Sequence, residues 1–219
     1  MPQNDDTVHR IRCQEVPELQ EVWKAFDSTP LPRVGSASAL FNNEQNVIKE
    51  IKALGQTCFS APPIKQAFDR TWAFQFNDDW NVHLGRLSLD ADKALNSPLA
   101  LKIKSIFGDS GQLSGFFYYP PGGFKEWHTD YEDPMSDPEK KWRVYMVRTT
   151  KDNKSWFQYY GKDKKIRKIM DRNAHMNLFN LTETPPLWHG VFSNTHRWSI
   201  GIKLDADVIH SLIQHRRVP

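Results

Sequence analysis

The chain has 219 residues, of which 39% are hydrophobic and 12% aromatic, enough to bury one sizeable core. Charged residues make up 25% and the formal net charge is only +3, so the composition excludes a disordered chain and does not indicate a general nucleic-acid-binding surface. No apolar stretch is long enough for a membrane span, and Met1–Arg10 lacks the apolar segment of a signal peptide. We therefore expect one cytoplasmic domain over 1–219 with no membrane partner, and no pattern favours a particular oligomeric state.

Residues 1–110 are predicted to form mostly helical support. Val16–Phe26 and Asn43–Leu54 carry apolar residues at helical spacing, so both should pack against a sheet. A further helix should begin at Ser97-Pro98 and end at Phe107, because serine is a good helix cap and proline suits the first turn.

Strand patterns appear twice in this region and dominate after Gly111. Thr71–Phe76 alternates as a strand does, and Val82–Leu89 is a second candidate. Six later runs are rich in aromatic and β-branched residues and are separated by turn residues: Leu113–Tyr119, Arg143–Arg148, Ser155–Tyr160, Met176–Leu181, Trp188–Ser193 and Arg197–Leu204. This pattern is typical of a barrel or double-sheet jelly roll. We predict a mainly β fold with flanking α, its core over 111–204 and a C-terminal tail or helix over 205–219.

Two other features are expected to have no role in the site. Cys13 and Cys58 are too few for a disulfide framework and lack metal-binding spacing, so they should be free thiols. Lys162–Lys168 (KDKKIRK) concentrates basic charge that could contact an anionic partner, but a solvated loop is the favoured interpretation.

The candidate metal ligands are His128, Asp130 and His189. His128 and Asp130 are separated by one residue, so on an extended segment their side chains point to the same side. His189 opens a later strand after Pro185-Pro186 and can supply a third ligand. Two histidines and one carboxylate leave three octahedral positions open, as in non-haem iron(II) oxygenases rather than structural zinc sites.

Arg197 and Ser199, on the next strand, are candidates for binding a carboxylate near this metal. A guanidinium and a hydroxyl on one strand face suit that group. They share a hairpin face with His189 only if the connecting loop has an odd length, for example Asn194–His196, or contains a bulge.

Each of these residues also has a simpler interpretation. His128 and Asp130 could be hydrogen-bonded within a loop. His189 could be an ordinary buried histidine, with His175 or His196 as the ligand instead. Arg197 could pair with a structural carboxylate.

The order His128-x-Asp130, distal His189 and Arg197-x-Ser199 resembles the iron(II)/2-oxoglutarate-dependent dioxygenase superfamily over about Gly111–Leu204. Within it, Tyr119-Pro-Pro-Gly is similar to prolyl hydroxylases, whereas His189-Gly-Val-Phe-Ser-Asn looks more like aspartyl/asparaginyl β-hydroxylases. Prolyl hydroxylases carry lysine at the position of Arg197, so both subfamilies stay open.

The resemblance implies a double-stranded β-helix of the cupin-like jelly-roll type. It implies Fe(II), 2-oxoglutarate and O2, with ascorbate as an optional reductant, and hydroxylation coupled to decarboxylation of 2-oxoglutarate to succinate and CO2. The intact Asp130 argues against a halogenase. The implied ligands are His128, Asp130 and His189 for iron, and Arg197, Ser199 and either Tyr118 or Tyr119 for 2-oxoglutarate.

The expected substrate is an amino-acid side chain, free or within a peptide or protein. Arg143 and Tyr145 share a strand face, and Trp127 and Tyr131 flank the His-x-Asp motif, so all four are candidate substrate contacts. A solvated face for the first two and core packing for the tryptophan are the alternatives. Tyr131–Lys141 is a candidate lid.

Two other functions fit the same residues. One is oxidation of a small molecule or, less favoured, a nucleic acid by the same chemistry. The other is a cupin-like or lectin-like jelly roll that binds a ligand without redox chemistry.

Overall fold

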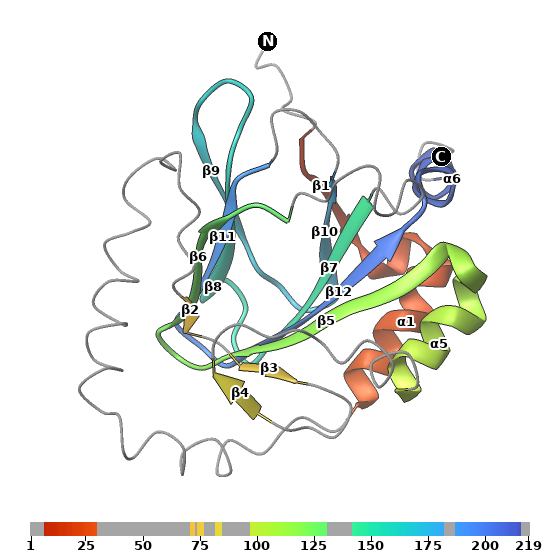
Figure 1. The fold of residues 1–219 in the computed structure, drawn as a ribbon, viewed down its shortest axis with the longest axis horizontal. Coiled ribbons are helices and arrows are strands. Elements are labelled where there is room, and N and C mark those ends of the chain that lie inside the picture. The colour runs from red at the N-terminus through yellow and green to blue at the C-terminus, as the bar shows by residue number, and fades with distance from the viewer. Residues whose placement is uncertain are drawn as a thin grey trace.

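Two antiparallel β-sheets form the centre of the fold (Figure 1). The structure is a computed structural model that describes residues 7–29, 71–72, 74–76, 82–84, 97–130, 142–181 and 187–215. One sheet has seven strands in the order β1-β10-β7-β12-β5-β3-β4, and the other has five in the order β2-β6-β11-β8-β9.

Most core strands alternate between the two sheets along the chain. The seven-stranded sheet contains β1 (His9–Arg12), β3 (Phe74–Phe76), β4 (Val82–Leu84), β5 (Gly111–Tyr119), β7 (Trp142–Thr149), β10 (His175–Asn180) and β12 (Arg197–Leu204). The five-stranded sheet contains β2 (Thr71–Trp72), β6 (Gly123–His128), β8 (Ser155–Tyr160), β9 (Ile166–Met170) and β11 (His189–Ser193). Crossing between facing sheets in this way makes a double-stranded β-helix, and the predicted jelly roll is confirmed.

The period of two along β5 and β12 gives the seven-stranded sheet two different faces. On β5, Phe116 and Tyr118 belong to the core shared with the helices, whereas Phe117 and Tyr119 face a pocket between the sheets. On β12, Ile200 and its alternate neighbours join the helix-side core, whereas Arg197 and Ser199 face the pocket. The same strands therefore bury the helices on one face and build the site on the other.

Helices α1 (Pro17–Ser28), α5 (Pro98–Phe107) and α6 (Ala206–His215) cover the outer face of the seven-stranded sheet (Figure 1). The Ser97 hydroxyl accepts from the Ala100 amide at 3.0 Å, and Gly108 follows the helix with φ +61°, so α5 has the cap and the stop that its sequence predicts. Short 3-10 turns occur at Cys13–Glu15 and Gly108–Ser110. No helix in the described ranges is long and apolar enough to cross a membrane.

Two connections bring the strands of the site together at one end of the jelly roll. Between β5 and β6, Gly123 N donates to Pro120 O at 2.7 Å, and Gly122 has φ +82°, as in a type II turn with Pro121 before the glycine. Gly122 N also donates to Ser193 O at 2.7 Å, so this turn is tied to the end of β11. The connection from β11 to β12 leaves from the same point.

The predicted elements agree with the structure in most places. The helices predicted at Val16–Phe26 and Ser97–Phe107 are confirmed as α1 and α5. The strand predicted at Thr71–Phe76 is split into β2 and β3. The helix predicted at Asn43–Leu54 lies outside the described residues. Of the strand predicted at Val82–Leu89, residues 82–84 form β4, and residues 85–89 lie outside the described residues.

Three strands differ from expectation. The solvated loop predicted at Lys162–Lys168 is wrong in its second half, because β9 begins at Ile166 and pairs with β8. Its exposed basic residues suit an edge strand, which must discourage pairing with other chains. β1 and β6 were not predicted as strands, and β6 proves to carry part of the site.

Candidate functional site

His128, Asp130 and His189 converge between the sheets. One ligand atom from each lies within 4.8 Å of the others. His128 Nε2 is 3.6 Å from Asp130 Oδ1, and His189 Nε2 is 3.4 Å from Asp130 Oδ2. The histidine ring centroids are 4.2 Å apart. Two nitrogens and a carboxylate around one point are a donor set for a divalent cation with coordination positions to spare.

Pairing of β6 with β11 produces this convergence. His128 lies directly opposite His189, and Asp130 follows just beyond the end of β6. The register then shifts, so that Val191 lies opposite Lys125. β6 has one extra residue over this stretch, a bulge that turns both His128 and Lys125 toward the same pocket.

The ring of His189 is oriented for metal ligation. Its Nδ1 lies 3.2 Å from the Leu187 carbonyl oxygen, which fixes Nδ1 as the donor. Nε2 is buried, has no hydrogen-bond partner in the described structure and is directed at Asp130. A buried imidazole nitrogen rarely stays without a partner, so a cation at this point would satisfy it.

The surroundings of Asp130 keep its carboxylate ionised. Burial alone would raise its pKa, but the neighbouring ammonium of Lys125, then the ring of His189 and the guanidinium of Arg143, outweigh burial and hold the pKa well below the usual value. Tyr145 donates its hydroxyl to Asp130 Oδ2 at 2.6 Å. Burial first, and then the charge of Asp130, raise the pKa of Tyr145 well above its ordinary value, so this phenol remains a donor.

Arg197, Ser199 and Tyr119 line the same pocket as His128 and His189. The side chain of Arg197 is buried, and its Nη1 donates to Ser199 Oγ at 3.0 Å. Its guanidinium carbon lies 4.9 Å from the ring centroid of Tyr119. Burial raises the pKa of Tyr119 to about 12, so its hydroxyl also remains protonated. A buried guanidinium and two hydroxyls are suited to a carboxylate.

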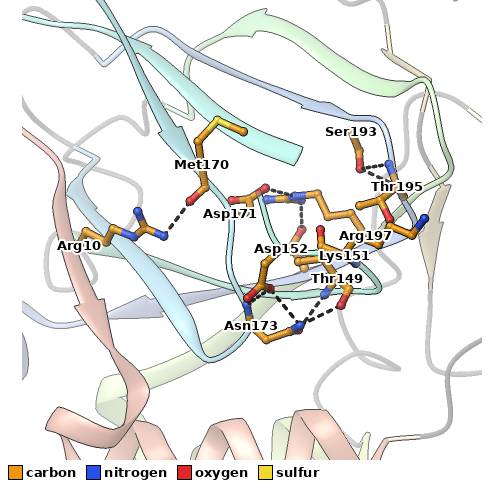
Figure 2. Close-up of polar contacts among 11 residues, drawn as sticks. Arg10, Thr149, Lys151, Asp152, Met170, Asp171, Asn173, Ser193, Thr195 and Arg197 are labelled. Carbon is orange, nitrogen blue, oxygen red and sulfur yellow. Dashed lines mark hydrogen bonds and ion pairs between the residues drawn. The ribbon is translucent and has the colours of Figure 1, made fainter. Parts of the chain in front are cut away.

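Arg197 also pairs with a protein carboxylate, the simpler interpretation that its sequence left open. Its Nε donates to Asp171 Oδ2 at 2.8 Å, and both side chains are 2% exposed (Figure 2). Nη2 has no bond to any described residue, so its N–H groups are available to donate to a ligand.

The loop between β11 and β12 has the predicted odd length, but it does not form the predicted hairpin. The loop is Asn194–His196, as expected. However, β11 and β12 belong to different sheets, so the loop is a crossover rather than a hairpin. Both side chains nevertheless line the same pocket, because both strands turn their inner faces to the space between the sheets.

Several candidates lie away from the pocket. Tyr118 faces the helices, and its hydroxyl lies 2.7 Å from Nδ1 of His196. His175 Nδ1 contacts the Asn173 carbonyl oxygen at 2.9 Å. Trp127 is 2% exposed and does not line the pocket. Of the two tyrosines considered for the carboxylate, only Tyr119 lines the pocket.

Arg143 and Tyr145 are both inside the jelly roll. Arg143 is 7% exposed, its Nη1 donates to Ser114 Oγ, and its guanidinium carbon lies 5.8 Å from the Tyr145 ring centroid. The alternative of a solvated strand face is therefore wrong for Arg143. Tyr131 and the predicted lid at Tyr131–Lys141 fall outside the described residues.

Lys125 and Asp171 were not among the predicted site residues. The Nζ of Lys125 lies 3.9 Å from Asp130 Oδ1, and the residue lines the pocket. Strict alternation from His128 would have placed Lys125 on the opposite face, and the bulge reverses this. Asp171 follows an exposed basic strand, where nothing in the sequence suggests a buried carboxylate.

Comparison with known proteins gives distant similarities. No protein-family model matches the sequence, and no curated protein matches it significantly. A Pseudomonas putida prolyl 4-hydroxylase structure aligns with 71% of this chain and 85% of its own, at 16% identity and TM-score 0.36. A Trichoplax adhaerens prolyl hydroxylase, solved with a hypoxia inducible factor fragment, aligns over 95% and 88%, at 14% identity and TM-score 0.41.

A third structure, an oxidoreductase of the 2OG-Fe(II) oxygenase family from Burkholderia pseudomallei, aligns over 75% of this chain and 79% of its own, at 11% identity and TM-score 0.34. All three similarities are too distant to assign an activity, which must come from the residues of the site.

Proposed function

We propose that this protein is an Fe(II)- and 2-oxoglutarate-dependent dioxygenase that hydroxylates an amino-acid side chain, free or within a peptide or protein. The observation that carries the proposal is one pocket lined by His128, His189 and the buried Arg197, with the carboxylate of Asp130 3.4–3.6 Å from the two histidine nitrogens. A metal site alone would also fit a cupin-like binding module, but a separate buried guanidinium in the same pocket suits a diacid co-substrate.

The described residues fit a divalent iron. His128, Asp130 and His189 supply nitrogen and oxygen donors from one side, and the buried Nε2 of His189 needs a partner. When bound, iron would supply the redox chemistry by which O2 and 2-oxoglutarate yield succinate, CO2 and a hydroxylated substrate.

The protein side chains would bind and orient the co-substrate. We assign the distal carboxylate of 2-oxoglutarate to Arg197, with hydroxyl donation from Ser199 and Tyr119. Ser199 Oγ already accepts from Arg197 Nη1, so its own proton is free to be donated to the ligand. Tyr145 would orient Asp130 through their hydrogen bond.

The substrate is proposed to approach near Arg143. Along β7, Thr149 lies opposite Arg197, whereas Arg143 lies opposite Lys203 at the other end of the pairing. Tyr145, which contacts Asp130, lies between them in the strand. Arg143 does not itself line the pocket, but it lies beyond Tyr145 on the side of the strand away from Arg197, where a carboxylate or carbonyl of an amino acid or peptide could accept from it.

Succinate formation tests this proposal. Protein supplied with Fe(II), 2-oxoglutarate and O2 should release succinate above background, and addition of the correct substrate should increase the rate. Asp130→Ala should reduce release to background, whereas Asp163→Ala, which removes an exposed carboxylate paired with Arg167, should not.

Comparing amino acids, peptides and oligonucleotides as stimulants would identify the substrate class. A folded protein that binds metal but forms no succinate with any of them would instead be a binding module.

A further inference from the structure

Asp171 is a buried carboxylate that the chemistry above does not use. It lies after β9, with its side chain 2% exposed, and its Oδ2 accepts from Arg197 Nε at 2.8 Å. A buried charge of this kind is costly unless it is paired, so its position must be closely determined by its surroundings.

The backbone around Asp171 is fixed on both sides. Its amide donates to the Ser155 carbonyl oxygen at 2.9 Å, and its own carbonyl oxygen accepts from the Asn153 amide at 2.9 Å. On the preceding residue, the Met170 carbonyl oxygen accepts from Arg10 Nη2 at 2.7 Å. The carboxylate therefore projects from a backbone that is held to the start of β8 and to the turn before it.

A second set of hydrogen bonds secures that turn (Figure 2). Asn173 donates through Nδ2 to the Thr149 carbonyl oxygen at 2.9 Å and accepts from the Thr149 amide at 2.9 Å. The Asn173 amide donates to Asp152 Oδ1 at 3.0 Å. Thr149 lies opposite Arg197 in the pairing of β7 with β12, so this network connects the backbone on both sides of the guanidinium.

These contacts determine the direction of the guanidinium of Arg197. Asp171 engages Nε, Ser199 engages Nη1, and the ring of Tyr119 lies 4.9 Å from the guanidinium carbon. Three contacts from three different strands or loops define the plane of a planar cation and leave Nη2 without a bond to a described residue. The unbonded edge is the one available to a ligand carboxylate.

We propose that Asp171 is a positioning residue for the co-substrate, holding Arg197 at a fixed distance from the metal ligands so that the pocket selects a five-carbon 2-oxo diacid. This inference rests on the proposed function. Because a displacement of about 1 Å can cost orders of magnitude in a preorganised site, loss of Asp171 should weaken and broaden diacid binding.

The test is calorimetric titration of the Mn(II)-loaded protein with 2-oxoglutarate, 2-oxoadipate and pyruvate. Pyruvate shares the metal-chelating end but lacks the distal carboxylate. Asp171→Asn should raise the Kd for 2-oxoglutarate about tenfold or more, the range seen when the support of a binding group is removed. It should also reduce the ratio of the Kd for 2-oxoadipate to the Kd for 2-oxoglutarate, and it should leave the Kd for pyruvate unchanged.

Asp163→Asn is the matched control, because it makes the same substitution at an exposed carboxylate that pairs with Arg167 at 2.5 Å. It should leave all three affinities unchanged. If Asp171→Asn does not fold, Asp171→Glu keeps the charge but moves it by one methylene, and it should change the preference between the two diacids without affecting pyruvate.

The outcomes separate the two proposals. Wild-type affinity and preference in a folded Asp171 variant, or an equal rise in Kd for pyruvate, would overturn the positioning role alone. A folded, metal-loaded wild-type protein that binds pyruvate and 2-oxoglutarate equally weakly would overturn the proposed function itself.

Discussion

Four polar groups lie around the carboxylate of Asp130. Both histidines, the Lys125 ammonium and the Tyr145 hydroxyl lie within 4 Å of its two oxygens. The hydroxyl is the closest at 2.6 Å, and Tyr145 is held in place by its own ring contacts. Tyr145 therefore determines which way the carboxylate faces before a metal arrives.

Tyr145→Phe should lower metal affinity with little change in stability. The hydroxyl that orients Asp130 is lost, whereas the packing of the ring against Phe157 and Phe179, with centroids 6.4 and 5.8 Å away, is kept. We expect about a tenfold increase in the Kd for Mn(II), measured by calorimetry. Tyr160→Phe, at the end of β8 and outside the pocket, is the control. An unchanged Kd would show that Asp130 needs no such support.

The sequence was sufficient to identify the residues that converge, but not those that support them. His128 and Asp130 were predicted from local spacing, and His189 and Arg197 from their order along the chain. Lys125 could not be predicted, because the bulge in β6 is set by pairing with β11 rather than by local sequence. Asp171 was missed because its partner is distant in the chain and joined only by the fold.

At the scale of elements, the helices and the site are built on opposite faces of the same strands. Phe26 of α1 is fully buried and packs edge-to-face on Phe116 of β5, with ring centroids 5.6 Å apart. The next residue on β5, Phe117, lines the pocket. Stability and metal binding should therefore respond to different substitutions.

Phe26→Ala should destabilise the protein by about 3–5 kcal/mol, because it leaves a large cavity in the core under α1. Leu101→Ala, on the exposed side of α5 where the side chain is 52% exposed, should cost less than about 0.5 kcal/mol. Urea unfolding measures both. The folded Phe26 variant should keep wild-type metal affinity, and a large loss of affinity would contradict the separation of the two faces.

Helices with strong caps and strands with clear alternation were predicted within a few residues, since local chemistry determines them. α5 has both its cap and its terminating glycine in the sequence. β1 and β9 were not predicted, because each is a polar strand that exists only through pairing with a neighbour, β10 or β8. The sequence also did not predict which sheet each strand joins. β11 and β12, for example, are consecutive in the chain but belong to different sheets.

At the scale of the molecule, the site joins the two sheets. His128 and His189 belong to the five-stranded sheet, whereas Arg197, Ser199 and Tyr119 belong to the seven-stranded sheet. A diacid that chelates the metal and reaches Arg197 would therefore bridge them. The proposed function therefore requires that the metal ligands and Arg197 bind the two ends of the same ligand.

The most direct test is the absorption spectrum of the protein with Fe(II) and 2-oxoglutarate under anaerobic conditions. A keto acid chelated to Fe(II) with open positions should give a weak band at about 500 nm. We expect this band for the wild-type protein and for His175→Ala, a histidine outside the pocket. We expect no band for His189→Ala or after chelation of the metal. A colourless wild-type protein, or a His189 variant that keeps the band, would contradict the proposed function.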